Sequence, residues 1–279
     1  MSAAPTMTPP TPTPAPRPPG PPDRAPWPVI DSLTADTDID VPANLGWYAA
    51  AKTAFDYAAA LGMLPLALFL IACAALAVKL TSPGPMFYTQ TRVGLNGRKY
   101  KIVKIRTMRA NVEAVSGIQW SQKGDSRITR VGRFLRATHI DEFPQLFNVL
   151  LGQMSLVGPR PERPEVIQAR GLNQLVPGYR HRLRVKPGVT GLAQVQLPAD
   201  TDVTSVRYKV VYDLYYVEHQ SLMLDVRLIA ATLFRAVGAG PKVLRRLFLL
   251  PSRRRVADAF YNRIVPPPEA APVAALQPA

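Results

Sequence analysis

The chain has 279 residues, one cysteine, Cys73, and a formal net charge of +15 at pH 7. A single cysteine excludes an intramolecular disulfide and a cysteine-based metal site, which fits a cytoplasmic location. So basic a chain indicates an anionic partner: a nucleic acid, an anionic membrane surface or a phosphorylated ligand. A basic surface kept only for solubility is the plain alternative. The charge is uneven, because residues 1–50 carry a net −3 and the rest carries +18.

Residues 1–45 form a proline-rich leader. Such a composition buries too little apolar surface to fold, so we expect this leader to be disordered. It does not have the pattern of a signal peptide, because no charged start is followed by an apolar stretch.

An uncharged run of 22 residues lies between Asp56 and Lys79. That length just crosses a bilayer as a helix, so we predict a membrane-embedded helix over residues 46–80. On the residues alone, two topologies compete. A spanning helix would place the acidic leader outside and the basic bulk inside. A re-entrant helix would break at Pro65 and return both Lys52 and Lys79 to the same side. A buried core helix of a soluble protein is the third interpretation.

Residues 81–240 have the pattern of a small, mixed, mainly helical domain, which makes the fold class α+β. Strand-like runs at 86–88 and 100–105 flank Asn96-Gly97, a dipeptide that favours a tight hairpin turn. Apolar residues at helical spacing predict three further helices, over residues 143–151, 206–217 and 222–237.

Asp141 and Glu142 stand side by side where the first of these helices begins. Pro144 is tolerated only in a first turn, so the acid pair is predicted at the N-terminus of the helix. Carboxylates there can hold Mg²⁺, which prefers phosphate oxygens as its other ligands, and one carboxylate can attack phosphorus. The structural alternative is a helix cap beside an arginine network. The arginines that crowd the pair are Arg127, Arg130, Arg133, Arg136, Arg160 and Arg163.

Two later segments suit phosphate binding as well. The prolines of residues 155–164 stiffen a loop that presents Arg160, whose planar fork matches phosphate; a rigid linker is the alternative. The glycines of residues 184–191 would let a backbone approach a ligand, although this signal alone is weak.

Residues 241–279 combine a basic amphipathic segment with a disordered Pro/Ala tail. That segment suits an anionic membrane surface or, equally, packing on the domain.

These motifs resemble those of the bacterial sugar transferases, the polyprenyl-phosphate glycosyl-1-phosphate transferases also called monotopic phosphoglycosyl transferases. The resemblance covers roughly residues 50–240. Seven blocks follow in the order of the family: residues 79–85, 90–94, 104–108, 127–136, 141–145, 155–161 and 186–191.

The resemblance implies a reaction and roles for particular residues. A nucleotide diphosphate sugar, with a UDP-sugar as the expected donor, would transfer its sugar 1-phosphate to polyprenyl (undecaprenyl) phosphate and release a nucleoside monophosphate. Asp141 would attack the sugar-linked phosphorus and form a covalent intermediate, and Glu142 would hold Mg²⁺ or Mn²⁺. The arginines implied in phosphate binding are Arg106, Arg133, Arg136 and Arg160. Pro65 would break a re-entrant membrane helix.

The family also implies a setting. The protein would sit in the bacterial inner membrane with its catalytic domain, residues 81–240, facing the cytoplasm. It would serve the first membrane step of polysaccharide or glycoconjugate assembly. Its partners would be a nucleotide sugar, polyprenyl phosphate and the membrane, and no nucleic acid; a homo-oligomer stays open.

The chain departs from the family in three places. Many relatives have Ser-Pro at the helix break, where this chain has Leu64-Pro65. Many continue from Gln-Val into Asn-Gly-Arg, where this chain continues into Gln196-Leu197-Pro198, so the preferred sugar does not carry over. Larger relatives have extra N-terminal spans, and this chain looks like the short form.

Two other functions fit part of the pattern. A non-enzymatic membrane adaptor would gather anionic lipid or nucleic acid on the basic surface, with aromatic residues such as Tyr88 and Tyr100 stacking on bases. A different phosphotransfer enzyme would use a nucleotide-alcohol donor. Neither the sugar nor the nucleotide follows from the sequence.

Overall fold

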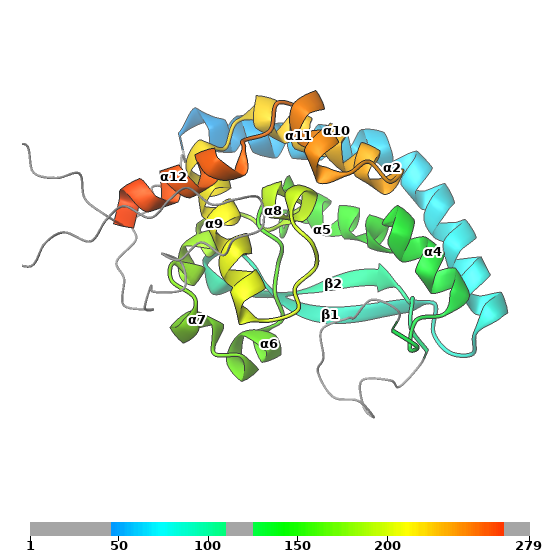
Figure 1. The fold of residues 1–279 in the computed structure, drawn as a ribbon. Helices are drawn as coiled ribbons and strands as arrows, with labels where there is room; N and C mark the ends of the chain where they lie inside the picture. The colour runs from blue at the N-terminus through cyan, green and yellow to red at the C-terminus, as the bar shows by residue number, and fades with distance from the viewer. Residues whose placement is uncertain (1–45, 110–124, 265–279) are drawn as a thin grey trace, which may run out of the picture.

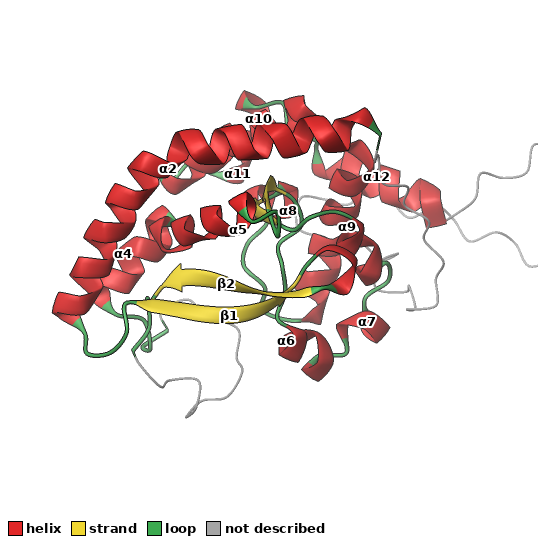
Figure 2. Cartoon of the chain, turned by 180° about the vertical axis from the view of Figure 1, so that it is seen from behind, coloured by secondary structure: helices red, strands yellow, loops and turns green. Residues whose placement is uncertain are grey.

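The computed structural model describes residues 46–109 and 125–264. The leader predicted over residues 1–45 and the tail from residue 265 onward lie outside the described residues. The described elements are mostly helices, with two small two-stranded sheets, so the α+β prediction is confirmed. Figure 1 shows the long helix α2 arching over the rest of the domain, and Figure 2 shows the same arch from behind.

Helix α2 (Trp47–Thr81) is 35 residues long and continues without interruption through Pro65. Its inward positions are mostly small, as at Ala60, Ala67 and Ala74, which are at most 6% exposed. Large apolar side chains point outward instead, and Leu66 and Phe69 are each 64% exposed. A helix dissolved in water would bury such side chains, so this outer face suits lipid. By length and composition, α2 could cross a bilayer.

The predicted hairpin is confirmed. Strands β1 (Phe87–Val93) and β2 (Lys99–Ile105) pair antiparallel around a short 3₁₀ turn, η1 (Leu95–Gly97). Asn96 and Gly97 have φ angles of 52° and 78°, the left-handed region that this dipeptide tolerates best. The hairpin forms a platform beneath the acid-pair segment, because Asn148 Nδ2 donates to the carbonyl oxygen of Lys101 at 2.8 Å.

The segment that carries the acid pair is less regular than a single helix. Helix α4 (Arg130–Thr138) is capped by His139. The 3₁₀ helix η2 (Ile140–Gln145) follows, and α5 (Leu146–Leu150) continues directly from η2. The predicted position of the acid pair in a first turn is confirmed, but that turn is 3₁₀. Pro144 lacks the N–H that an α-helix interior needs, which explains the break.

A compact group of short elements follows. Strand β3 (Ser155–Val157) pairs parallel with β4 (Gly188–Thr190), with α6 (Pro164–Ala169), α7 (Leu172–Leu175) and η3 (Tyr179–Arg184) between them. Helix α8 (Leu192–Gln196) comes directly after β4.

The last four helices close the domain. They are α9 (Val203–His219), α10 (Leu222–Ala236), α11 (Pro241–Leu247) and α12 (Arg253–Ile264). The predicted helices at 206–217 and 222–237 are therefore confirmed. Helix α9 crosses the core, where Val210, Leu214 and Tyr216 are at most 2% exposed. In Figure 1, α10 and α11 lie beside α2 on the same side of the molecule.

Candidate active site

The acid pair is positioned by a sharp turn between two helices. Thr129 caps the start of α4 by accepting a hydrogen bond from the Gly132 N–H at 2.9 Å. Helix α4 ends at His139, whose φ of 58° is left-handed. This turn places Asp141 and Glu142 in the first turn of η2, where both are only 8% exposed. The N-terminus of a helical segment favours carboxylates, because its unpaired N–H groups carry partial positive charge.

Glu142 is held by two cations. Lys104 Nζ on β2 donates to Glu142 Oε1 at 2.5 Å, and Arg160 donates to the same oxygen at 3.0 Å. Burial acts to raise the pKa of Glu142, but Arg160 and Lys104 outweigh burial and hold that pKa well below its ordinary range. Glu142 is therefore ionised, and its charge fixes the positions of both cations.

Asp141 has a different environment. Its carboxylate makes no hydrogen bond and no ion pair with any residue that the structure describes. Burial, and then the charge of Glu142, raise its pKa to about 6, although Lys104, Arg136 and Arg160 oppose the rise. The Asp141 carboxylate is thus desolvated, close to cations and not engaged in holding the fold. Such a group is suited to act as a nucleophile toward an electron-poor centre.

The structure brings two of the four predicted phosphate-binding arginines to the acid pair. Arg160 bonds to Glu142, and Arg136 acts electrostatically on Asp141 while its Nε donates to Thr107 Oγ1 at 2.8 Å. The other two lie elsewhere. The guanidinium of Arg106 is buried against the connection from α2 to β1, where Nη2 donates to the carbonyl oxygen of Ser82 at 2.8 Å. Arg133 is exposed on α4.

Sequence reasoning missed Lys104 and His139. Lys104 lies on the same face of β2 as Tyr100 and the buried Ile102, and this alternation was the available signal. His139 forms the left-handed turn directly before the acid pair, within reach of the charges of Glu142, Arg160 and Lys104. Its position directly before the acid pair could have indicated this.

The glycine-rich segment at residues 184–191 is a scaffold in this structure. A side chain at Gly188 would collide with the Gly158 backbone nitrogen at 2.0 Å, and one at Gly191 with the Gly158 carbonyl oxygen at 2.2 Å. The close backbone approach is therefore made to the proline-rich loop that carries Arg160.

The residues present fit a magnesium ion that is completed by substrate. Within the described part of the chain, no three His, Cys, Asp or Glu side chains gather into a metal-binding group. Mg²⁺, however, is commonly held by one or two carboxylates together with phosphate oxygens and water. The Asp141 carboxylate and the second oxygen of Glu142 make no hydrogen bond with any described residue, and both can serve as such ligands.

Comparisons with known proteins show which proteins this chain resembles. A family model described as bacterial sugar transferase matches residues 47–239. The chain is 44% identical over 194 residues to the exopolysaccharide production protein PSS of Rhizobium leguminosarum bv. phaseoli, covering 68% of this chain and 96% of that protein.

Two longer relatives match over part of their length. One is the UDP-N-acetylgalactosamine-undecaprenyl-phosphate N-acetylgalactosaminephosphotransferase of Aeromonas hydrophila, 42% identical over 186 residues, or 67% of this chain and 43% of that protein. The other is the UDP-glucose:undecaprenyl-phosphate glucose-1-phosphate transferase of Xanthomonas campestris pv. campestris, 42% identical over 182 residues, or 64% of this chain and 36% of that protein. The matches to these two therefore span less than half of each relative.

Proposed function

Because this chain belongs to the bacterial sugar transferase family, we propose that it transfers a sugar 1-phosphate from a UDP-sugar to undecaprenyl phosphate and releases UMP. The observation that carries the proposal is the state of Asp141. Its carboxylate is buried, makes no hydrogen bond with a described residue, and lies among Lys104, Arg136 and Arg160. A carboxylate used only for the fold would be bonded to its neighbours.

The reaction follows as two displacements at one phosphorus. An oxygen of Asp141 attacks the sugar-linked phosphorus of the donor, an acyl-phosphate bond forms, and the bond to the departing UMP breaks. A phosphate oxygen of the lipid then attacks the same phosphorus and releases the Asp141 carboxylate. Neither step requires a general base, because both nucleophiles are anions. The protein has to position the reactants and neutralise their charge.

The cations supply that neutralisation. Lys104 and Arg160 are fixed by Glu142 before substrate arrives, so no reorganisation is needed when charge develops on the phosphate oxygens. Mg²⁺, when bound, would shield the phosphate charge further, and Glu142 with Asp141 would hold it.

Replacement of Glu142 by Gln should raise the Mg²⁺ concentration needed for half-maximal transfer, whereas Glu165→Gln on the exposed start of α6 should leave it unchanged.

Helix α2 is not broken at Pro65, but its packing supports a membrane helix with both ends on one side of the bilayer. Near its start, Lys52 Nζ lies 2.8 Å from Asp225 on α10. Near its end, Ile71 and Val78 pack with Ile105 of β2 and Leu135 of α4. Both ends therefore contact one folded body, whereas a helix crossing about 30 Å of hydrocarbon would carry one end away from it. We infer that α2 enters the membrane without crossing it, with the domain on the cytoplasmic face.

Cysteine labelling tests this topology. Cys73 is replaced by Ser, and single cysteines are placed at Trp47 and Leu80, which are 80% and 76% exposed. A membrane-impermeant maleimide should label neither position in intact cells and both after lysis. Labelling of one end in intact cells would show that the helix crosses the membrane.

The same packing gives the acceptor a route to the site. Ile140 and Phe143, on either side of the acid pair, pack against the cluster that contains the end of α2. A lipid phosphate lying beside α2 would therefore be close to Asp141. This proximity would raise the effective concentration of the lipid phosphate at Asp141.

A donor screen tests the function. The full chain in lipid nanodiscs is given undecaprenyl phosphate and a panel of UDP-sugars and nucleotide-alcohols, and released UMP or CMP is measured. UDP-glucose and UDP-N-acetylgalactosamine come first, because the relatives' names contain them. We expect UMP release from one UDP-sugar, dependent on Asp141. Release of nucleotide from a nucleotide-alcohol alone would point to a different transferase, and release from no donor would contradict the proposal.

A further inference from the structure

The loop that presents Arg160 is held by its carbonyl oxygens. Pro159 and Pro161 have no N–H, so this stretch cannot form an ordinary hydrogen-bond ladder. The Pro159 carbonyl oxygen instead accepts from the Gly188 N–H at 3.0 Å, and the Glu162 carbonyl oxygen accepts from the Val93 N–H at 3.0 Å. Backbone donors from β4 and β1 thus fix the two ends of the loop.

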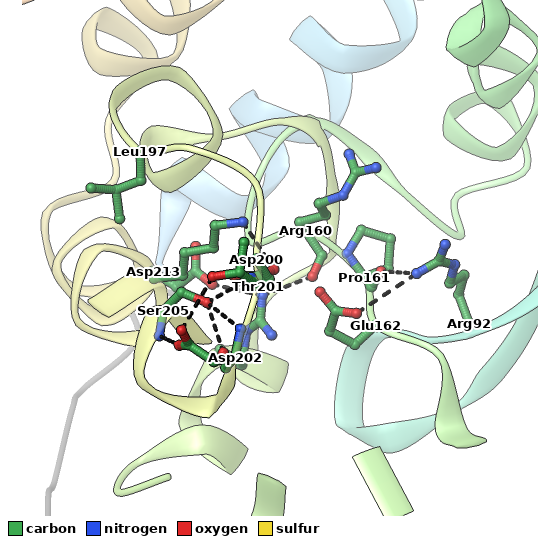
Figure 3. Close-up of polar contacts among 12 residues, drawn as sticks. Arg92, Arg160, Pro161, Glu162, Leu197, Asp200, Thr201, Asp202, Ser205 and Asp213 are labelled. Carbon is green, nitrogen blue, oxygen red and sulfur yellow. Dashed lines mark hydrogen bonds and ion pairs between the residues drawn. The ribbon is translucent and has the colours of Figure 1, made fainter. Parts of the chain in front are cut away.

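Arginine side chains hold the two carbonyls in the middle. Arg182 Nη2 donates to the carbonyl oxygen of Arg160 at 2.7 Å, and Arg92 Nη1 donates to that of Pro161 at 2.9 Å. Figure 3 shows Arg92 beside Pro161 and Glu162, with the Arg160 guanidinium pointing away from Asp213. Two arginines of a strongly basic chain are thus occupied in holding a third.

Arg182 is itself fixed by a buried partner. Its guanidinium lies 2.7 Å from Asp213 on α9, and the two side chains are 5% and 2% exposed. It also lies 5.2 Å from the centre of the Tyr179 ring. A buried guanidinium without a counter-charge would be costly, so Asp213 makes this placement of Arg182 tenable.

The chain of contacts ends at the acid pair. The carbonyl oxygen of Arg160 is held by Arg182, and the side chain of the same residue bonds to Glu142 at 3.0 Å. Arg160 is 36% exposed, so its long side chain would sample many rotamers if its backbone moved. A displacement of about 1 Å at a catalytic group can cost as much as 10²-fold in rate.

We propose that the Arg182–Asp213 ion pair is a positioning device for Arg160, and that it sets the charge presented beside Glu142 during phosphate transfer. The inference rests on the proposed transfer reaction. Arg182 and Asp213 act only through Arg160 and do not touch the substrate. The ion pair thus links α9, which crosses the core, to a cation of the site.

The first test does not depend on activity. The full chain is treated with phenylglyoxal, which modifies accessible guanidinium groups, and the rate at Arg160 is read by peptide mass spectrometry. The double variant Arg182→Met with Asp213→Leu replaces the ion pair by apolar groups, a change that proteins often tolerate. We expect Arg160 to react about tenfold faster in this variant, as for the loss of one hydrogen bond to a charged group.

Two controls bracket that measurement. Arg133, exposed on α4, should react at the same rate in both proteins. The variant Arg254→Gln breaks an ion pair of α12, in which Arg254 Nε lies 3.7 Å from Asp258, without touching the loop. It should leave the reactivity of Arg160 unchanged. An unaltered Arg160 rate in the folded double variant would overturn the proposal.

The second test is a double-mutant cycle on kcat. Arg182→Lys keeps a charge beside Asp213 but loses the planar fork, and should lower kcat by roughly 10- to 100-fold with little change in KM for the donor. In an Arg160→Lys background the same change should lower kcat less than about twofold. An equal loss in both backgrounds would show that Arg182 does not act through Arg160.

The two tests separate two failures. Wild-type protein inactive with every donor, together with a faster Arg160 reaction in the double variant, would reject the transfer reaction and keep the positioning of Arg160. Wild-type activity together with an unchanged rate of Arg160 modification in the double variant would keep the transfer reaction and reject the positioning of Arg160.

Discussion

Two buried aspartates of this protein have different roles, one in the fold and one in the candidate active site. Asp225 on α10 is fully buried and accepts hydrogen bonds from Tyr48 at 2.8 Å, Lys52 at 2.8 Å and Tyr216 at 2.6 Å. Asp141 is nearly as buried, yet its carboxylate has no hydrogen-bond partner among the described residues. The first joins the start of α2 to the domain, and the second is left free at the centre of the site.

Asp141 makes the fold less stable than a hydrogen-bonded aspartate would. Burying a carboxylate is unfavourable unless donors replace the lost water. Asp225 has those donors, so its burial stabilises one arrangement of α2 and α10. Asp141 lacks them, and burial raises its pKa to about 6. Nearby cations and a substrate phosphorus have to provide what hydrogen bonds provide for Asp225.

Removing the Asp141 nucleophile should have the largest effect. Asp141→Asn should lower transfer by a factor on the order of 10⁴ or more, because no covalent intermediate can form. Its melting temperature should stay the same or rise, since a desolvated charge is lost. Labelled sugar transfer to lipid and thermal unfolding in the same detergent measure the two effects.

Transfer that survives in the Asp141 variant would place the nucleophile elsewhere. Asp258→Asn, on α12 with its side chain 64% exposed, is the matched control and should leave both transfer and melting temperature unchanged.

The opposite behaviour is expected at Asp225. Asp225→Ala should lower the free energy of unfolding by roughly 3–5 kcal/mol, because it leaves the Tyr48 and Tyr216 hydroxyls without their acceptor and Lys52 with only Asp56, 3.7 Å away, as a counter-charge. The folded fraction should keep the wild-type kcat. Adding Lys52→Met should recover part of the stability, and a loss of kcat without a loss of stability would contradict this role. Thermal unfolding and active-site titration separate the two quantities.

The transfer activity should depend on pH through Asp141. Asp141 attacks only when ionised, so kcat/KM for the donor should fall about tenfold per pH unit below pH 6. Lys104 lowers the pKa of Asp141, and its removal in Lys104→Met should therefore raise that pKa and move the acidic limb to higher pH. A limb that stays in place would show that Lys104 does not act on the nucleophile.

The smallest effects on kcat/KM are expected for substitutions of Arg136 and Arg133, and the two should differ. Arg136→Ala should lower kcat/KM for the donor by roughly tenfold, because a cation near Asp141 is lost. Arg133→Ala on the same helix should lower it less than about twofold. Equal losses measured by steady-state kinetics would mean that Arg133 reaches the substrate.

Local patterns predicted most of the fold. Asn96-Gly97 predicted the hairpin because only a few residues accept two positive φ angles, and apolar spacing predicted α9 and α10. The 3₁₀ form of the acid-pair turn was not predicted. It depends on Pro144 and on how η2 packs against β2.

The site was predicted less completely than the fold. The adjacency of Asp141 and Glu142 was visible in the sequence, and Arg160 stood in a stiff loop. The roles of Lys104 and Arg182 were not visible, because each depends on contacts with residues more than 20 positions away along the chain. Arg106 stands apart from the acid pair, because its guanidinium donates to backbone carbonyl oxygens.

The most direct measurement is mass spectrometry of the protein incubated with its UDP-sugar donor and without lipid acceptor. We expect a sugar phosphate attached to Asp141, formed with release of one UMP and lost when undecaprenyl phosphate is added. A sugar phosphate on any other side chain, or turnover with no adduct at any time, would contradict the assignment of Asp141 as the nucleophile.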